Sequence, residues 1–526
     1  MERKWLGFPL GVWAYGLLLS LLTVTPYVVG FASAPPGGGY SGALVEPFGV
    51  SVDVNSHLAK LWQGRQGQLA YCLPFTAERH PCLLGVQGFY VLLGALLPLD
   101  VRLSYHLARF ALSLGVVLGL WRLIVRLLAA GRGRWWALLA ATLLMGYGWL
   151  LPLVAPHITQ GLASIEFWLS DAYAFLGMLI MPHFAAAILL HIGLILALDD
   201  WQHRRGGSSR LALILAALAI VQPYGAALFG PVLALGGVIL VGWRRALTLV
   251  PLLALYGALT LAQLVALSSD PTWQAFSAQN ITLSPPPLYL LLGYAPFLLA
   301  LLMGLRVVWP ALRTERLWWV LALWAGLAFV LAYAPLQTQR RYLLGVQTPL
   351  ALLAASAWAA YSLDRRRIAN LLGLVGLGLG LTAPLLLMVG NVSQLSRADS
   401  ARVFYDAEQA QAYDWVRNST LPSAVFWTTF DWDGLGSGGL LAALTGRRVS
   451  LGHWIETRDF DRKIAQVRRF YDPQTGEAER LAMLERIDYV WYDDWARALG
   501  SWWPGASDRL RLVYRGQTIQ IYEVLP

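Results

Sequence analysis

Long apolar runs separated by short polar segments fill the first 390 residues of the chain. Since a helix needs about 20 apolar residues to cross the bilayer core, this pattern predicts about eleven transmembrane spans. The predicted spans lie near residues 6–31, 102–126, 135–155, 172–197, 210–222, 226–243, 246–267, 287–307, 317–335, 342–361 and 368–390. The fifth runs through Gln222-Pro223-Tyr224 into the sixth, so these two are also compatible with one broken hairpin.

The first long polar segment, Ser51–Cys82, directly follows the first span. Asp53, His57 and Lys60 stand at positions i, i+4 and i+7, so they share one face if residues 52–63 are helical. The same stretch carries a periodic apolar stripe, which consists of Val54, Leu58, Leu61 and Trp62. We therefore expect an amphipathic helix that lies along the membrane surface.

The composition changes at about Asn391, where charged residues become more frequent and apolar runs shorten. From there, short helical and strand-like stretches alternate, which is typical of a small α/β domain. The predicted helices are 406–418, 433–445, 459–470 and 476–486, and the predicted strands are 424–428, 448–451, 489–492, 511–514 and 518–524. The sequence thus predicts a transmembrane domain at 1–390 and an α/β domain at 391–526. In the first, the loop 32–100 carries the amphipathic helix and an apolar interfacial helix at 83–98.

Only 13% of the 526 residues are charged, whereas a soluble domain carries about 25%. The formal net charge of +10 is compatible with nucleic-acid binding, but the basic residues gather in alternate loops, as the positive-inside rule describes. They are Arg3, Lys4, Arg122 to Arg134, Arg204, Arg205, Arg210, Arg244, Arg245, Arg306, Arg313, Arg316, Arg365, Arg366 and Arg367. We expect a multi-pass protein of the plasma (inner) membrane with a cytoplasmic N-terminus, an extracytoplasmic α/β domain and no nucleic-acid partner.

Asp53 is the first candidate catalytic residue, because other polar groups accompany it on the same loop. They are His57, Lys60, Glu78 and His80. A carboxylate in such a cluster can take a proton from a substrate hydroxyl, which is general-base catalysis. The alternative is an ordinary solvated acid on an interfacial helix. Cys72 and Cys82 lie on this loop too, and they either form a disulfide, if the loop faces an oxidising compartment, or remain free thiols.

Other loops predicted on the outer side carry further candidates. Arg340 and Arg341 depart from the charge pattern, and their guanidinium forks at the start of a span suit a lipid phosphate. Snorkelling to lipid headgroups is the alternative for this pair. His183 either lines a substrate cavity or lies in a kinked helix. The loop before it holds two acids, Glu166 and Asp171, and an N-cap role for Asp171 is an equal alternative.

Gly434, Gly436 and Gly439 match the spacing of a dinucleotide-binding fingerprint. We interpret them instead as a tight turn before a helix, because a domain outside the cytoplasm is not supplied with nicotinamide cofactors. The nearby segment 451–457 is rich in polar and aromatic groups. It either contacts a sugar acceptor, since aromatic faces suit pyranose rings, or packs at the junction of the domain and the membrane.

Several short stretches resemble a known family: Asp53 with HLAKLWQG at 57–64, Arg79-His80-Pro81, and SYHLARFALS around Arg109. With the predicted order of elements, they make the chain similar to the GT-C glycosyltransferase superfamily. That superfamily includes protein O-mannosyltransferases, aminoarabinose transferases and catalytic subunits of oligosaccharyltransferases, and the likeness is greatest to bacterial family-39-like members. The resemblance covers the whole chain in architecture, but only short patches in motif.

The resemblance implies that Asp53 is the catalytic base and that the donor is a polyprenyl-phosphate-linked sugar. It also implies that a second acid, Glu166 or Asp171, helps to hold a metal ion or the acceptor. A divalent ion such as Mg²⁺ or Mn²⁺ at Asp53, Glu166 and Asp171 is therefore a candidate cofactor, although this region has no Asp-x-Asp motif.

The predicted protein is thus a polytopic α-helical membrane protein with an extracytoplasmic α/β domain. We expect it to transfer a hexosyl or pentosyl group to an acceptor hydroxyl on a lipid, a glycan or a protein. We also expect it to be surrounded by membrane lipids. The expected substrate-binding residues are His57, Lys60, Glu78, His80, Glu166, Asp171, His183, Arg340 and Arg341. A transporter or flippase of lipid-linked sugars is one alternative, and a non-catalytic membrane sensor or scaffold is another.

Overall fold

The computed structural model describes residues 4–47, 49–159, 163–364 and 366–526, so Arg3 and Arg365 lie outside the described residues. The chain divides into two compact units. The helical unit consists of Met1–Val24, His106–Ala262 and Ile281–Val389. The mixed unit consists of Thr25–Tyr105, Gln263–Asn280 and Gly390–Pro526. The polar loop after the first helix thus folds together with the C-terminal segment.

Six stretches of the described chain are helical, long and apolar enough to cross a membrane. They are Leu10–Ala32 (α1), Val101–Leu127 (α4), Pro182–Gln202 (α9), Pro223–Val241 (ending in α11, Ala226–Val241), Trp243–Ser268 (ending in α13, Val250–Ser268) and Arg367–Arg397 (within α19, Arg366–Arg397). A seventh candidate is the pair α15 (Pro287–Gly293) and α16 (Ala295–Thr314), which is bent by 68°. This length and composition are those of a polytopic membrane protein. The count of eleven stays a prediction.

Two predicted spans are interrupted. The stretch 135–155 forms α5 (Arg132–Thr142) and then only the short helix α6 (Leu151–Val154). Between them, the amides of Met145 and Tyr147 donate to carbonyls of neighbouring segments instead of to their own helix. The stretch 172–197 is split into α8 (Ala174–Ile180) and α9 at Pro182, because proline has no N–H and disfavours a helical residue before it.

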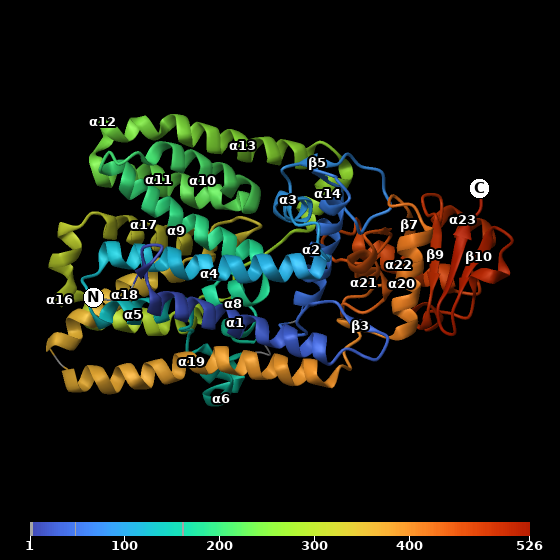
Figure 1. Cartoon of the computed structure of the whole chain (residues 1–526). Coiled ribbons are helices and arrows are strands. Elements are labelled where there is room, and N and C mark those ends of the chain that lie inside the picture. Colours follow the sequence, from blue (N-terminus) through green and yellow to red (C-terminus); the bar gives the residue numbers. More distant parts are fainter. Residues whose placement is uncertain (1–3, 48, 160–162, 365) are drawn as a thin grey trace. The chain divides into compact units, whose positions relative to one another are not determined.

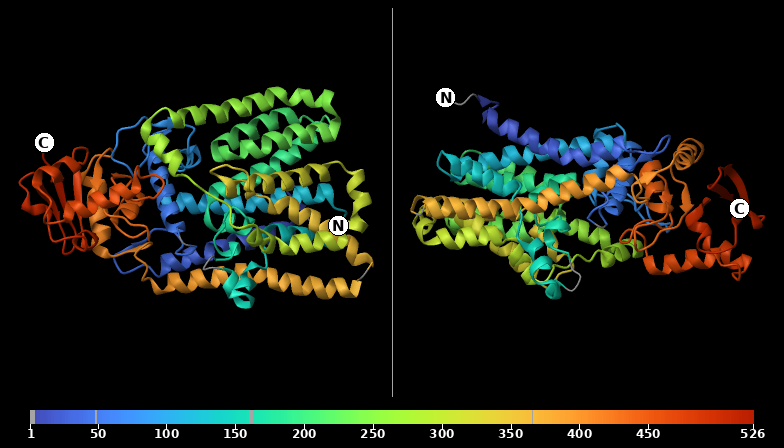
Figure 2. Two further views of the ribbon diagram at one scale, coloured as in Figure 1. Left: turned by 180° about the vertical axis from the view of Figure 1, so that it is seen from behind. Right: turned by 90° about the horizontal axis from the view of Figure 1, so that it is seen from below.

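Within the helical unit, α9 packs against α10 (Gly207–Val221), α11 against α17 (Leu317–Ala332), and α16 against α18 (Gln347–Asp364). Figure 2 shows these helices as a bundle in two further views. Arg126 at the end of α4 pairs with Asp199 of α9 at 2.6 Å and with Glu315 at 3.1 Å. Arg316 donates to Leu240 O at the end of α11. Two arginines predicted on the same side of the membrane, Arg126 and Arg316, therefore lie at the same end of this bundle.

The mixed unit contains a five-stranded sheet with the order β10-β11-β9-β7-β8. Figure 1 labels β7, β9 and β10 of this sheet. Its strands are β7 (Val425–Trp427), β8 (Arg448–Val449), β9 (Tyr489–Tyr492), β10 (Leu510–Arg515) and β11 (Gln520–Val524), and its main helices are α20 (Ala407–Ser419), α21 (Ser437–Thr445), α22 (Phe460–Tyr471) and α23 (Glu477–Met483). β7, β8 and β9 run parallel, whereas β9, β11 and β10 pair antiparallel. These bounds confirm the strands and helices predicted after residue 391.

Both faces of this sheet are covered. On β7, Phe426 packs in a core with residues of α20 and α21, whereas Val425 and Trp427 pack in a second core with residues of α22. The loop after the first span contributes α2 (Val50–Arg65), which packs against α21 and against α3 (Gly88–Leu96). The predicted helix at 83–98 is therefore shorter, because β5 (Leu83–Leu84) precedes it and pairs with β4 (Ala70–Tyr71).

Candidate functional site

Helix α2 carries the first group of candidates, and the structure confirms its predicted helical conformation. It begins after Gly49, whose φ of 87° lies in the left-handed region that glycine tolerates. Most of its side chains are buried against α3 and α21, including those of His57 and Lys60. Asp53 lies in the first turn of α2 and differs from them, because 42% of its side chain is exposed. One carboxylate of this helix is thus open to solvent.

His453 holds that carboxylate. Its Nε2 lies 3.5 Å from Asp53 Oδ1, while its Nδ1 accepts the backbone N–H groups of Ile455 at 3.1 Å and Glu456 at 3.2 Å. A ring nitrogen that accepts two N–H groups carries no proton, so this network assigns the proton to Nε2, which points at Asp53. Asp53 therefore has one oxygen near a donor and an exposed surface elsewhere.

Glu456 lies in the same cluster, but it is fully enclosed. Its carboxylate accepts the Lys60 ammonium group at 2.8 Å, the Ser56 hydroxyl at 2.6 Å and the Tyr71 hydroxyl at 2.5 Å. Burial raises the pKa of Glu456, but Lys60, His453 and Ser56 outweigh it and bring the pKa to about 2. The pKa of Tyr71 is raised well above its usual range by burial and by Glu456. Lys60, predicted to bind substrate, is thus held in a buried ion pair.

The other predicted residues of this loop also have protein partners. The His57 ring stacks on Tyr90 with centroids 4.0 Å apart. Glu78 pairs with Lys463 at 2.7 Å; burial raises its pKa, and Lys463 and Thr76 lower it by more. His80 accepts the Leu73 N–H at its Nε2 and bonds Glu78 O through its Nδ1, and burial lowers its pKa.

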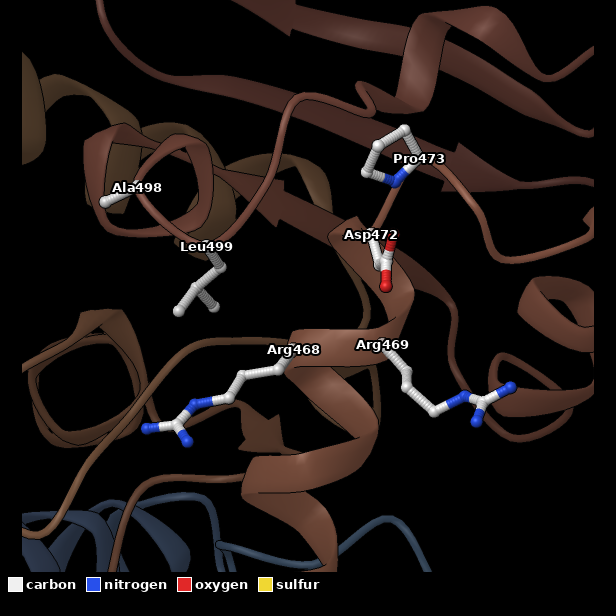
Figure 3. Close-up of a pocket in the computed structure, with 6 residues that line it drawn as sticks. All are labelled: Arg468, Arg469, Asp472, Pro473, Ala498 and Leu499. Atoms are coloured by element: carbon white, nitrogen blue, oxygen red, sulfur yellow. The ribbon is translucent and has the colours of Figure 1, made fainter.

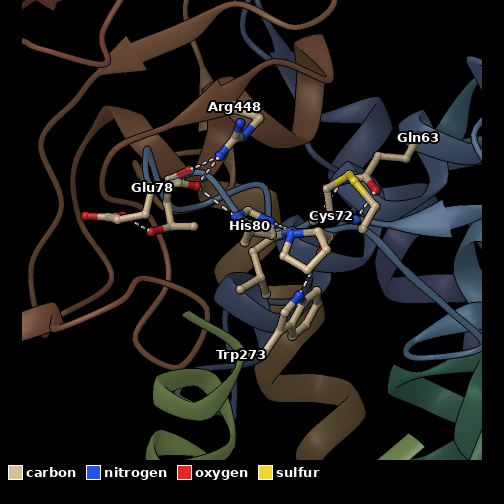
Figure 4. Close-up of a disulfide and its surroundings, with 10 residues drawn as sticks. Gln63, Cys72, Glu78, His80, Trp273 and Arg448 are labelled. Atoms are coloured by element: carbon tan, nitrogen blue, oxygen red, sulfur yellow. Dashed lines mark hydrogen bonds between the residues drawn. A yellow bond between two sulfur atoms is a disulfide. The ribbon is translucent and has the colours of Figure 1, made fainter. Parts of the chain in front are cut away.

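A disulfide joins Cys72 to Cys82 beside these groups (Figure 4), with the Cα atoms 4.4 Å apart. Gln63 of α2 bonds both the carbonyl and the amide of Cys72, at 2.6 and 3.0 Å. Trp273 donates to Pro81 O, and Arg448 donates to Glu78 O. The 72–82 loop is therefore fixed to α2 and to the C-terminal segment, and Glu78 and His80 contribute to that attachment.

The helical unit contains the second group of candidates. Asp171, only 1% exposed, accepts Arg341 Nη1 at 3.2 Å and lies 3.8 Å from Arg340 Nε. The guanidinium groups are 29% exposed in Arg340 and 23% in Arg341. Their planes lie over aromatic rings, Arg340 over Trp168 at 5.4 Å and Arg341 over Phe184 at 5.6 Å. Phe184 and Asp199 lie at opposite ends of α9, about 22 Å apart, so this cluster is remote from Arg126.

The same unit places Glu166 and His183. Glu166 is fully buried and accepts the Gly148 N–H at 2.6 Å, and burial raises its pKa to about 7. The His183 ring packs on Phe184 at 4.4 Å. Among the described residues, no group of three or more His, Cys, Asp or Glu side chains gathers to hold a metal ion. Asp171 is engaged by the arginines and Glu166 by the Gly148 amide, and the divalent-ion site at Asp53, Glu166 and Asp171 stays a prediction.

The mixed unit contains a cavity of about 500 Å³ (Figure 3). Its lining residues are Arg468, Arg469, Asp472, Pro473, Ala498 and Leu499. Figure 3 shows the two guanidinium groups pointing in different directions, and Arg469 is paired with Glu479 at 2.7 Å. The arginines therefore do not converge on one anion, and we assign this cavity no role.

Sequence reasoning named Asp53 and Lys60, but not their partners. His453 and Glu456 are about 400 positions further along the chain. The only signal was the polar and aromatic character of segment 451–457, which was left with two interpretations. Gly434 and Gly436 have φ values of 72° and 126°, in agreement with the predicted tight turn.

No protein-family model matches the chain, and no curated protein matches it. Among similar solved structures, the oligosaccharyltransferase of Archaeoglobus fulgidus in the apo form is 12% identical, with a TM-score of 0.49 over 92% of this chain and 69% of that chain. ArnT from Cupriavidus metallidurans bound to undecaprenyl phosphate is 12% identical, with a TM-score of 0.47 over 95% and 97%. Arabinofuranosyltransferase AftD from Mycobacteria is 15% identical, with a TM-score of 0.46 over 97% and 41%.

These neighbours are GT-C glycosyltransferases. Because all three TM-scores lie below 0.5 and the identities are 12–15%, no residue role, substrate or acceptor is carried over to this chain.

Proposed function

We propose that the protein is a membrane glycosyltransferase that moves a sugar from a polyprenyl-phosphate donor to an acceptor hydroxyl, with Asp53 as the general base. The observation that carries this proposal is the contrast within one cluster. Glu456 is enclosed and neutralised by Lys60, whereas Asp53 is half-exposed and lies 3.5 Å from Nε2 of His453. A base must be open to its substrate and held in place, and Asp53 meets both conditions. The GT-C resemblance of the sequence supports the reaction class.

In the proposed reaction, Asp53 takes the proton of the acceptor hydroxyl as its oxygen attacks the anomeric carbon of the donor sugar. The new C–O bond forms while the bond between that carbon and the phosphate oxygen breaks. The phosphate leaves with the electron pair, so negative charge grows on its oxygens. Exposed guanidinium groups suit such a charge, and we assign that role to Arg340 and Arg341.

Asp53→Asn tests the base directly, using purified full-length protein and a radiolabelled polyprenyl-phosphate sugar. We expect transfer to fall by about 10²- to 10⁴-fold, while binding of the donor and the melting temperature stay unchanged. Asp508→Asn, another exposed aspartate of the mixed unit, serves as the matched control and is expected to keep full activity. Near-normal transfer by Asp53→Asn overturns the role of Asp53. Absence of transfer from every common donor by the unaltered protein points instead to transport or to a non-catalytic role.

A further inference from the structure

Two tryptophans of the mixed unit, Trp432 and Trp454, form what we call the indole shelf. Their rings are nearly parallel, with an interplanar angle of 17° and centroids 6.4 Å apart. Trp432 is 55% exposed, yet it is held firmly. Its Nε1 donates to Asp461 at 3.0 Å, and Phe460 meets its ring edge-on at 4.7 Å. Trp454 donates to Asp431 O at 3.2 Å. An exposed aromatic ring is thus fixed in one orientation.

The indole shelf lies at the N-terminal end of α2, where Asp53 is. Trp454 directly follows His453, whose Nε2 is 3.5 Å from Asp53. The Trp454 ring also borders Gly49, the residue before α2, since a Cβ added there would approach the ring to 3.1 Å. Gly434, two residues after Trp432, packs equally close to Val52 of α2. The exposed indole and the exposed carboxylate therefore belong to one local structure.

The chemistry of the indole shelf favours a sugar ring over a lipid headgroup. A flat aromatic face packs well against the C–H face of a pyranose. Carboxylates accept hydrogen bonds from hydroxyl groups, and Asp431, Asp433 and Asp461 surround Trp432 in sequence or in space. The same acids disfavour an anionic lipid surface, which attracts basic segments.

We propose that the indole shelf is the acceptor subsite and that it binds a pyranose saccharide, with one hydroxyl of the bound sugar directed to Asp53. The role of Asp53 in this assignment rests on the proposed function, whereas the binding of a saccharide does not. Among lipid, glycan and protein acceptors, the proposal selects those that present a sugar ring.

Binding is tested with the full-length Asp53→Asn protein in the absence of a donor, so that no sugar can be transferred. Because the chain has 24 tryptophans, the signal is read on the ligand, by saturation-transfer NMR. The probes are methyl β-D-glucopyranoside and methyl α-D-mannopyranoside, with sorbitol as a polyol that has hydroxyls but no ring face. We expect saturation of the ring C–H protons of at least one glycoside, and none for sorbitol.

Adding Trp432→Ala is expected to weaken that binding by about threefold to tenfold, and Trp432→Phe by less. Trp503→Ala, which removes a tryptophan that is 49% exposed elsewhere in the unit, is the matched control and should change nothing. Equal saturation with and without Trp432, or equal saturation of sorbitol, overturns the proposal. In the transfer assay with the native Asp53, Trp432→Ala should raise the KM for a saccharide acceptor and leave kcat within about twofold.

A membrane anchor is the competing role for an exposed tryptophan. A nitroxide at Trp432→Cys in the protein reconstituted in bilayers distinguishes the two, because both native cysteines are in the disulfide. Greater accessibility to a water-soluble relaxing agent than to oxygen supports the saccharide site, and the reverse overturns it. A failure of the proposed function shows as activity in Asp53→Asn or as no transfer at all. Neither result alters the binding measurement.

Discussion

The two charged clusters that hold the candidate residues expose opposite charges. In the mixed unit, the cation Lys60 is buried and one carboxylate, Asp53, is 42% exposed. In the helical unit, the carboxylate of Asp171 is 1% exposed, and the cations Arg340 and Arg341 are 29% and 23% exposed. The first cluster thus buries an ion pair, Lys60 with Glu456, and presents a carboxylate, whereas the second buries a carboxylate and presents guanidinium groups.

This difference matches two different chemical tasks. The buried charged side chains fix the geometry of a cluster, while its exposed side chain can still interact with a ligand. An exposed carboxylate can accept a proton, and exposed guanidinium forks can bind phosphate. In the mixed unit the buried pair is Lys60 with Glu456, and in the helical unit the buried member is Asp171. The comparison therefore predicts that changes at buried members alter stability and changes at exposed members alter activity or binding.

Glu456→Gln should have the largest effect. It leaves Lys60 buried and unpaired, so we expect a loss of about 3–5 kcal/mol of stability, measured as a fall in melting temperature in detergent. The pKa of Glu456 lies at about 2, below its usual 4.5. Its contribution, about 3 kcal/mol, is therefore fully present above about pH 4.5 and is lost as the pH falls towards 2.

The matched control for Glu456 is Glu479→Gln, which removes the exposed partner of Arg469. Since exposed ion pairs contribute little, its melting temperature should equal that of the unaltered protein. Equal melting temperatures for Glu456→Gln and Glu479→Gln would show that the buried pair does not stabilise the mixed unit.

Loss of the disulfide should have the next largest effect. Cys72 and Cys82 close a loop with a sequence separation of 10, for which loop-closure entropy predicts a contribution of about 3 kcal/mol. The double change Cys72→Ser with Cys82→Ser should lower the melting temperature accordingly. Because the arginine cluster belongs to the helical unit, donor binding at low temperature should be unchanged. A large loss of donor binding would contradict the assignment of the phosphate to that cluster.

Arg341→Ala tests the exposed members of the helical unit. It removes one fork from the proposed phosphate site, so we expect donor binding to weaken by about tenfold to a hundredfold. Arg341→Lys should restore only part of the donor affinity, because an ammonium group lacks the planar pair of N–H donors of a guanidinium group. Arg468→Ala, an exposed arginine of the mixed unit, is the control. Unchanged donor affinity in Arg341→Ala would favour headgroup snorkelling for this residue.

Much of the fold could be predicted because the helices and strands depend on patterns that are local in the sequence. The apolar runs indicated the long helices, and alternation of short periodic stretches indicated the strands and helices after residue 391. The interruptions at residues 143–150 and 181 were missed because composition does not show where amides bond to neighbouring segments. The path through Met145 and Tyr147 depends on carbonyls of Gly380 and Leu292, and no local pattern shows such contacts.

The candidate site could be predicted only in part, for the same reason. The spacing of Asp53, His57 and Lys60 showed that they share a helix, but not that Lys60 is enclosed. Its partner Glu456 is almost 400 residues away, so a salt bridge that decides the role of Lys60 leaves no trace in the local pattern. Arg340 and Arg341 stood out because they broke a regular charge pattern, which is a signal that a single sequence does contain.

The smallest expected effect is at His453, which positions Asp53 and also caps its own turn. These two roles use different ring nitrogens, so they can be separated. The oxygen of an asparagine can take the place of Nδ1 and accept the N–H groups of Ile455 and Glu456, but asparagine has no group that reaches Asp53. Glutamine can place a donor near the position of Nε2 but fits the turn less well.

His453→Asn should therefore keep the melting temperature and lower kcat/KM by about threefold to tenfold. The other charged groups that face His453, Glu456 with its partner Lys60, are unaltered in this variant, and so is Tyr71. His453→Gln should retain kcat/KM, measured per folded molecule, even if its melting temperature falls. If both variants lose activity only in proportion to stability, His453 packs the turn and Asp53 acts without its help.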